Sequence, residues 1–239
     1  MSSHTIIVLG MHRSSTSCLT GQLQQAGLEL GDVVEQAPHN RNGNRENLDI
    51  RALNDTLLAY NNAAWDSPPT EISWNSQHQA ARDAIIQLYA DSAVWGFKDP
   101  RTMFTLPFWL EGLDEDKLQF IATYRNPFSV AKSLNARQPD LTIEKGLALW
   151  REYNEKLLDY HKQYDFPVLN FDLDPTSYLQ AFHKAVQSLG KLSISADKKL
   201  DFFDDALRHQ NAISTAELQQ YARILAPEML IHQQLGLLT

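Results

Sequence analysis

The stretch that most constrains the fold of this chain is residues 5–20, TIIVLGMHRSSTSCLT. It begins with an apolar run rich in β-branched side chains, which predicts a buried strand that stops at Gly10. A short polar loop follows, and Leu19 and Leu23 then recur at helical spacing. A loop that leads into a helix N-terminus directs several N–H groups and the positive end of the helix dipole at one point. This stretch therefore predicts a phosphate-binding loop.

The side chains of this loop suit an anionic ligand. Arg13 supplies a full positive charge, and hydroxyl donors come from Ser14, Ser15, Thr16 and Ser17. The alternative is an ordinary strand-to-helix turn. A nucleotide-hydrolysing loop reads G-x-x-x-x-G-K-[ST], but here Ser15 and Thr16 stand where its second Gly and its Lys belong. The loop thus lacks the lysine of that class, and its cation is Arg13.

The sequence GMHRSSTS, residues 10–17, resembles the 5′-phosphosulfate loop of sulfotransferases that use 3′-phosphoadenosine 5′-phosphosulfate (PAPS). The resemblance implies that this loop binds the nucleotide co-substrate through Gly10, His12, Arg13, Ser14, Ser15, Thr16 and Ser17. The usual form of the motif is R-S-G-T-S, so Ser15 in place of Gly is a departure. If the backbone there has a positive φ, Ser15 carries a cost in strain.

Composition limits the remaining possibilities. A chain of 239 residues with 43% hydrophobic residues is long enough for one sizeable domain, 1–239. The formal net charge of −8 argues against a general binder of nucleic acids or anionic membranes. A single cysteine, Cys18, excludes an internal disulfide framework and fits a reducing compartment. With no apolar run long enough to span a bilayer, we expect a soluble, cytoplasmic protein.

Periodicity predicts alternating strands and helices. Strands are expected at residues 93–97, 118–124 and 167–171, and helices at 48–60, 75–90, 142–164, 176–189, 215–225 and 228–235. The predicted fold is a single α/β domain whose central parallel sheet of four to five strands is flanked by helices, with the phosphate loop after the first strand, as in P-loop NTPases. The resemblance covers a core at 5–173, and 174–239 form a C-terminal helical part.

A long polar segment, residues 32–47, exceeds a routine connector and predicts a functional loop or lid. The pattern G-x-x-E-x-x-D-I at its end, carried by Gly43, Glu46, Asp49 and Ile50, resembles a bacterial branch of the sulfotransferases. That resemblance implies that Glu46 is the general base, and a carboxylate near the sulfuryl group can take the proton of an acceptor hydroxyl. Alternatively, Glu46 is a favourable charge near a helix N-terminus. His12, His39 and Asp99 are the other candidates for the base.

Two further groups follow predicted strands. Lys98, Asp99 and Arg101 lie at the carboxyl end of a strand, the edge where open parallel sheets bind ligands. The block WGFKDPRT resembles a recurrent sulfotransferase block, which implies that Lys98 assists the transfer and that Asp99 and Arg101 contact the acceptor side. The alternative is a surface Lys–Asp pair followed by a proline turn.

Arg125 and Ser133, eight positions apart, follow the most apolar strand. A guanidinium at a strand tip and a hydroxyl on the adjoining helix can grip one phosphate. This spacing resembles the 3′-phosphate motif of sulfotransferases, and the resemblance implies that both residues bind the 3′-phosphate of PAPS. Arg208, in the charged stretch 203–211, is a further nucleotide-binding candidate by the same resemblance, with a solvated charged turn as the alternative.

Over most of its length, residues 5–173, the sequence resembles a PAPS-dependent sulfotransferase. The resemblance implies in-line transfer of a sulfuryl group to a hydroxyl or amine of a carbohydrate-like or other small acceptor. We expect no metal, because the loop lacks the lysine that accompanies Mg²⁺, and the net charge and the lack of a long apolar run lead us to expect no nucleic acid and no membrane span. Aromatic residues that could line an acceptor pocket are Trp65, Trp74, Phe104, Phe108 and Trp109. Two other classes stay open: a phosphate-loop kinase or nucleotidase, and a catalytically inactive nucleotide-binding or scaffold protein.

Overall fold

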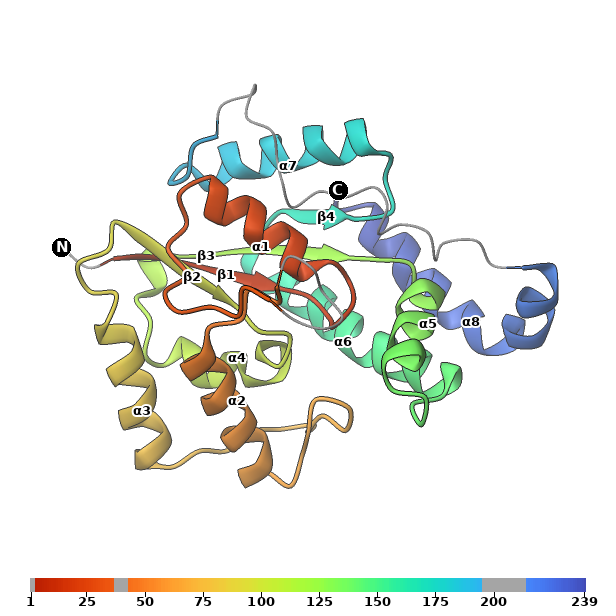
Figure 1. Cartoon of the computed structure of the whole chain (residues 1–239), viewed down its shortest axis with the longest axis horizontal. Helices are drawn as coiled ribbons and strands as arrows, with labels where there is room; N and C mark the ends of the chain where they lie inside the picture. Colours follow the sequence, from red (N-terminus) through yellow and green to blue (C-terminus); the bar gives the residue numbers. More distant parts are fainter. Residues whose placement is uncertain (1–2, 37–42, 195–213) are drawn as a thin grey trace.

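The computed structural model describes residues 3–36, 43–194 and 214–239. Its centre is a sheet of four parallel strands in the order β2-β1-β3-β4 (Figure 1). The strands are β1 (His4–Leu9), β2 (Val94–Lys98), β3 (Leu118–Tyr124) and β4 (Val168–Asn170). The predicted α/β fold with a parallel sheet is confirmed.

Helices cover both faces of the sheet, as Figure 1 shows. One face packs against α1 (Thr16–Gln25) and α7 (Pro175–Leu189). The other packs against α2 (Leu48–Tyr60), α3 (Ser76–Gln87), α4 (Thr102–Leu110) and α6 (Ile143–Tyr164). The short turn η1 (Glu115–Lys117) precedes β3, and α5 (Pro127–Arg137) and α8 (Thr215–Gly236) pack beside α6.

The central strand explains the apolar run in the sequence. Ile6 and Val8 point into the core beneath α1 and α7, whereas Ile7 and Leu9 point into the core on the opposite face. All four side chains are at most 1% exposed. A strand buried on both faces needs apolar residues at every position instead of at alternate ones.

The strand order positions the loops that follow the strands. The chain leaves β1 for β2 on one side and later enters β3 on the other, so the connections diverge between β1 and β3. In open parallel sheets such a divergence, at the carboxyl ends of the strands, opens the crevice in which ligands bind. The register pairs Val8 with Lys98 and Leu9 with Ala122, which brings the ends of three strands together.

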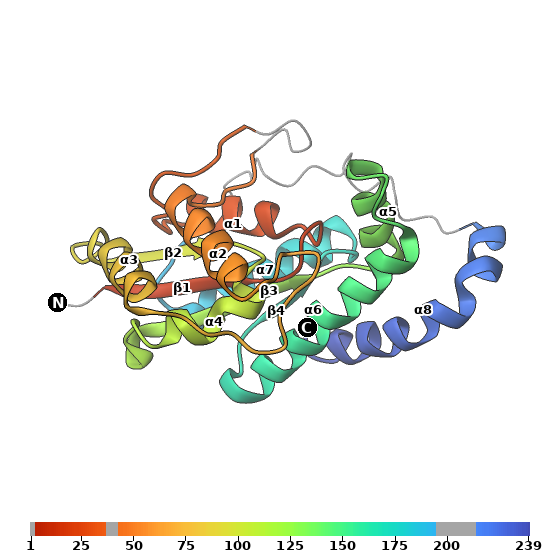
Figure 2. The same cartoon turned by 90° about the horizontal axis from the view of Figure 1, so that it is seen from below.

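Two helices differ from the sequence-based expectation, and each contains a proline. No helix was predicted at α4, which contains Pro107. Proline has no N–H to donate to the carbonyl four residues earlier, that of Met103, and Tyr160 Oη donates to this oxygen instead, at 3.1 Å. Helix α8 is continuous, where two helices at 215–225 and 228–235 were expected. Pro227 lies within α8, and Figure 2 shows the helix bending along its course.

Among residues 3–36, 43–194 and 214–239, no helix is both long and apolar enough to cross a membrane.

The close approach of β1 and β2 yields a testable prediction at Gly96. A Cβ atom there would lie 2.0 Å from the carbonyl oxygen of Ile6, which is backbone and cannot move aside. We expect Gly96→Ala to lower the free energy of unfolding by about 1–3 kcal/mol or more, measured by urea denaturation. Gly112→Ala is the matched control, since its new methyl group would meet the side chain of Arg82. Equal losses in the two variants would contradict the prediction.

Candidate active site

The loop after β1 turns tightly against β3. Gly10 has a φ of 139°, and a Cβ atom there would lie 2.5 Å from the carbonyl oxygen of Thr123. Arg13 and Ser15 have φ values of 66° and 65°, in the left-handed region that non-glycine residues rarely occupy. Ser15 is the N-cap residue of α1, and its side chain makes no capping hydrogen bond within the described structure. The condition set out for Ser15 therefore holds: this position has a positive φ.

Two polar atoms of the same loop are buried without a hydrogen-bond partner among the described residues. They are Nε2 of His12 and Oγ of Ser14. Buried polar groups in native proteins are nearly always hydrogen-bonded, so such atoms call for an explanation. A loop that holds two of them next to a helix N-terminus and an arginine is suited to bind an oxyanion.

Arg13 connects this loop to the helix after β3. Its Nε donates a hydrogen bond of 2.7 Å to Oγ of Ser133 on α5, although the two residues are 120 positions apart. Burial and the charges of Arg137 and Arg125 lower the pKa of Arg13. Like charges gathered in this way destabilise one another, and a bound anion would relieve the repulsion. The structure thus brings together the phosphate loop and the Arg125–Ser133 pair.

Arg125 follows β3 directly, and its surroundings hold it in place. Its Nε lies 3.7 Å from Oδ1 of Asp172, and its guanidinium carbon lies 5.6 Å from the ring centroid of Phe171. Its carbonyl oxygen accepts a hydrogen bond of 2.9 Å from Nε1 of Trp150. Asp172, which comes after β4, also accepts from the backbone N–H of Asn126. The next strand of the sheet thereby positions Arg125.

Lys98 and Glu46 form a buried ion pair beside the first turn of α1. Their Nζ and Oε1 atoms are 2.9 Å apart, and their side chains are 2% and 9% exposed. Lys98 Nζ also lies 3.4 Å from Oγ of Ser17. Glu46 reaches this point because the segment before α2 folds back on α1, where Ser17 Oγ donates to the carbonyl of Asn44 at 2.9 Å. Asn47, not Glu46, caps α2, so the carboxylate of Glu46 is directed to Lys98.

Asp99 and Arg101 form a second charged unit. Asp99 Oδ1 accepts from Nη1 of Arg101 at 2.9 Å, and Oδ2 accepts from Nδ2 of Asn54 at 2.9 Å. Burial raises the pKa of Asp99, while the charge of Arg101 opposes that rise. Burial disfavours the charged form of Arg101. The negative charges of Asp99 and Asp55 have a larger combined effect in the opposite direction and raise the pKa of Arg101. The alternative of a surface Lys–Asp pair is wrong, because Asp99 is buried and pairs with Arg101.

Aromatic side chains pack around His12. Its ring lies edge-on to Trp65, with centroids 4.7 Å apart, and to Tyr153, at 6.2 Å. Phe104 packs edge-on against Tyr153 at 4.8 Å. Trp65 and Phe104, two of the five aromatic residues suggested for an acceptor pocket, therefore lie close to the loop.

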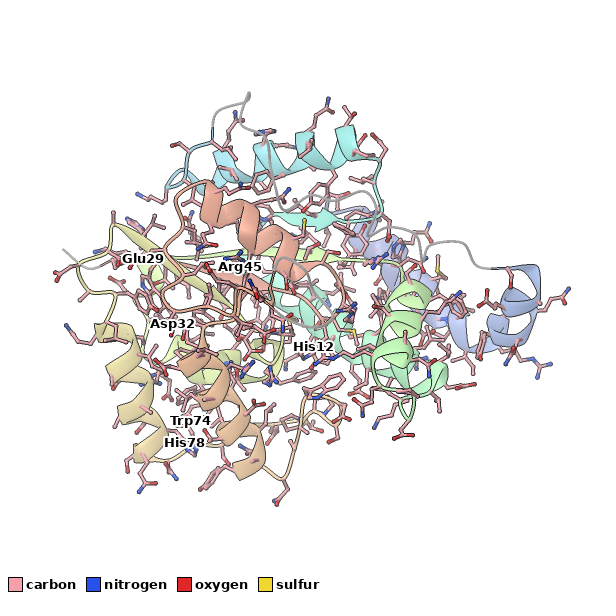
Figure 3. The ribbon with its side chains drawn as sticks, in the orientation of Figure 1. His12, Glu29, Asp32, Arg45, Trp74 and His78 are labelled. Atoms are coloured by element: carbon pink, nitrogen blue, oxygen red, sulfur yellow. The ribbon has the colours of Figure 1, made fainter. Side chains whose placement is uncertain are left out.

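Of the other three suggested aromatic residues, Phe108 and Trp109 belong to the core, and Trp74 is partly buried and packs against it. Phe108 and Trp109 have no exposed surface, and Trp74 packs on Phe108. Figure 3 shows Trp74 beside His78 and away from His12. Phe104, Phe108 and Trp109 all lie on α4, and their spacing in the sequence does not distinguish the partly buried Phe104 from the two buried rings.

Sequence reasoning missed three residues of the site, and two candidates lie outside the described residues. Asn54 is fully buried and bonds Asp99, Tyr153 packs on His12, and Asp172 positions Arg125. Asn54 is a polar residue on the apolar face of α2, and this exception to the pattern could have identified it from the sequence.

Arg208 and His39 fall within 195–213 and 37–42, outside the described residues. Among the residues described, no group of three or more His, Cys, Asp or Glu could hold a metal ion.

Comparison with known proteins supports the fold. A solved sulfotransferase domain from the curacin biosynthetic pathway matches with a TM-score of 0.53 and 15% identity, over 99% of this chain and 98% of that one. A sulfotransferase domain from the olefin synthase of Synechococcus PCC 7002 matches with a TM-score of 0.46 and 18% identity, over 89% and 79%. No protein-family model matches the chain, and no curated protein matches its sequence. The chain thus has a sulfotransferase-like fold.

The positive φ of Ser15 leads to a second prediction. Glycine adopts this conformation without the steric cost that Cβ imposes. We expect Ser15→Gly to raise the free energy of unfolding by about 0.5–1 kcal/mol, measured by urea denaturation. Ala80→Gly, at an exposed position inside α3, is the control and should lower it by a similar amount. A loss of stability in both variants would show that Ser15 is not strained.

Proposed function

We propose that this protein transfers a sulfuryl group from PAPS to a hydroxyl or amine of a small, carbohydrate-like acceptor. The observation that carries the proposal is the hydrogen bond of 2.7 Å from Arg13 to Ser133. It brings a loop suited to a 5′-phosphosulfate next to a pair suited to a 3′-phosphate, and PAPS carries both groups. The sulfotransferase-like fold supports the same conclusion.

Each end of the nucleotide has its own set of residues in this proposal. The phosphosulfate would be held by Arg13, by the backbone N–H groups of the loop and by the hydroxyls of residues 14–17. The loop fits that role because Ser14 Oγ is buried and has no partner among the described residues. The 3′-phosphate would be held by Arg125 and Ser133. A guanidinium and a hydroxyl fixed on neighbouring elements provide charge-assisted hydrogen bonds to a single phosphate.

The transfer itself is a displacement at sulfur. A bond forms between the acceptor oxygen or nitrogen and sulfur, and the bond from sulfur to the bridging oxygen breaks. The bridging electron pair leaves with the adenosine bisphosphate, and Arg13 and Lys98 stabilise the charge that develops there. Glu46 receives the acceptor proton, and Asp99 and Arg101 face the acceptor side. No step in this scheme requires a metal. We also propose that the reaction takes place in the cytoplasm.

Two alternatives make different predictions. A phosphate-loop kinase or nucleotidase would bind Mg²⁺ with its nucleotide, and Thr16 stands where the lysine of that class belongs. A catalytically inactive nucleotide-binding protein would bind PAPS without forming product. The strained Ser15 at a position usually held by Gly is the observation that favours the inactive alternative.

Nucleotide binding tests the proposal directly. We expect titration calorimetry to show that adenosine 3′,5′-bisphosphate binds without Mg²⁺ and at least tenfold more tightly than ADP, with the preference lost in Arg125→Ala. A charge-assisted hydrogen bond to phosphate contributes about 1.5–3 kcal/mol, or roughly 10–150-fold in affinity. Lys132→Ala, on α5 beside Ser133 but paired with Glu217, should keep the preference. Binding of Mg-ADP alone would contradict the proposed function and favour the kinase alternative.

The role of Glu46 has its own test. Replacing Glu46 by Gln keeps the size of the side chain but removes the proton-accepting carboxylate. We expect the rate of adenosine 3′,5′-bisphosphate formation from PAPS, with a mixture of sugar and phenol acceptors, to fall at least about 100-fold, because general bases contribute 10²–10⁴-fold. The affinity for the nucleotide should not fall, because Lys98 loses the carboxylate that neutralises its charge. Glu35→Gln, at an exposed side chain, serves as the control, and an unchanged rate in Glu46→Gln would exclude this role.

A further inference from the structure

His12 stands apart from the other polar residues of the loop because it is an ionisable group with a buried, unused nitrogen. Its Nε2 has no hydrogen-bond partner among the described residues. The edge-on contacts with Trp65 and Tyr153 fix the position of its ring from two other segments of the chain. Figure 3 shows His12 near the middle of the molecule, whereas His78 lies at its periphery. A buried ring nitrogen without a partner in this loop calls for an explanation.

Cations surround this imidazole from several elements. Arg101 acts on it from the start of α4, Lys98 from the end of β2, Arg137 from the end of α5, and Arg13 from the adjacent position. Tyr153 is the ionisable group of α6 that packs against it. Two acids near these cations are already paired, Asp99 with Arg101 and Glu46 with Lys98.

The protonation state of His12 in the free protein follows from these surroundings. Burial and then the four cations hold the pKa of His12 well below its ordinary value. The imidazole is therefore neutral at pH 7. A neutral imidazole can donate from one nitrogen only, and its other nitrogen would repel an anion.

A bound anion changes this balance. The phosphosulfate loop that we propose includes Arg13, so the negative charges of a nucleotide would lie within the same group of cations that acts on His12. A nearby negative charge favours the charged form of histidine, and an imidazolium donates from both nitrogens. The unused Nε2 would then have a donor proton and an oxyanion to receive it.

We propose that His12 binds the 5′ end of the nucleotide as an imidazolium, and that nucleotide binding takes up one proton at the imidazole ring. The inference rests on the proposed function and goes beyond it, because it adds a cation that exists only in the bound state. The proton comes from the solvent, and no covalent bond changes. Its consequence is that the affinity for the nucleotide rises as the pH falls. Between the free and bound pKa values of His12, one linked proton changes the affinity about tenfold per pH unit.

Calorimetry can count the proton. Adenosine 3′,5′-bisphosphate is titrated at pH 6.5–7.5 in two buffers that differ in ionisation enthalpy, with wild type, His12→Asn and His78→Asn. The phosphates of the ligand also exchange protons, but that contribution is common to the three proteins. On binding the nucleotide, wild type and His78→Asn should each take up more protons than His12→Asn does. We expect a difference of at most one proton. We also expect His12→Asn to lose roughly tenfold in affinity at pH 6 and less at pH 8.

Nuclear magnetic resonance of the His12 ring nitrogens in wild type provides a second readout, which does not depend on the folding of a variant. The expected result is a neutral imidazole in the free protein and an imidazolium in the complex. Binding with equal proton uptake in wild type and His12→Asn, or a ring that stays neutral when bound, overturns the inference and leaves the proposed function standing. If wild type does not bind the nucleotide at all, the proposed function fails, and this inference fails with it.

Discussion

The hydrogen bond between Arg13 and Ser133 is the interaction on which the candidate site depends. It connects the loop after β1 with the helix after β3, and these elements meet because the two strands are paired in parallel with Leu9 opposite Ala122. A shift in that register would separate the loop from α5. The buried central strands thus set the distance between the two ends of the proposed nucleotide, and rigid elements hold such a distance better than loops do.

The charges of the site fall into two groups with different electrostatic properties. Lys98 and Arg101 each lie against a carboxylate, Glu46 and Asp99, that neutralises much of their field. Arg13 instead lies under the influence of other guanidinium groups, and its lowered pKa reflects both burial and those charges. The protein is acidic overall, with a net charge of −8, so this cationic region contrasts with the rest of the chain. In the site that we propose, this selective pairing favours the loop as the position of an anion.

The loop after β1 also contains several energetically unfavourable features. Ser15 and Arg13 adopt left-handed backbone conformations, and polar atoms of His12 and Ser14 are buried without partners among the described residues. Each feature costs free energy in the folded protein, and together they occur within six residues after β1. Strain and unsatisfied groups that gather in one loop are typical of a site whose ligand compensates for them.

Much of the fold and part of the site could be read from the sequence, because they depend on local patterns. Periodicity and turn chemistry identify the apolar run before Gly10, the polar loop after it and the strand that ends before Arg125. These local patterns predict the parallel sheet and the edge at which the loops meet. Other features depend on contacts between distant residues. Glu46 meets Lys98 across 52 positions, Tyr160 satisfies the carbonyl that Pro107 leaves open in α4, and Trp65 and Tyr153 enclose His12. Charge, burial and hydrogen-bond partners arise from such packing, so only the tertiary structure decided which polar residues are paired and which are buried without a partner among the described residues.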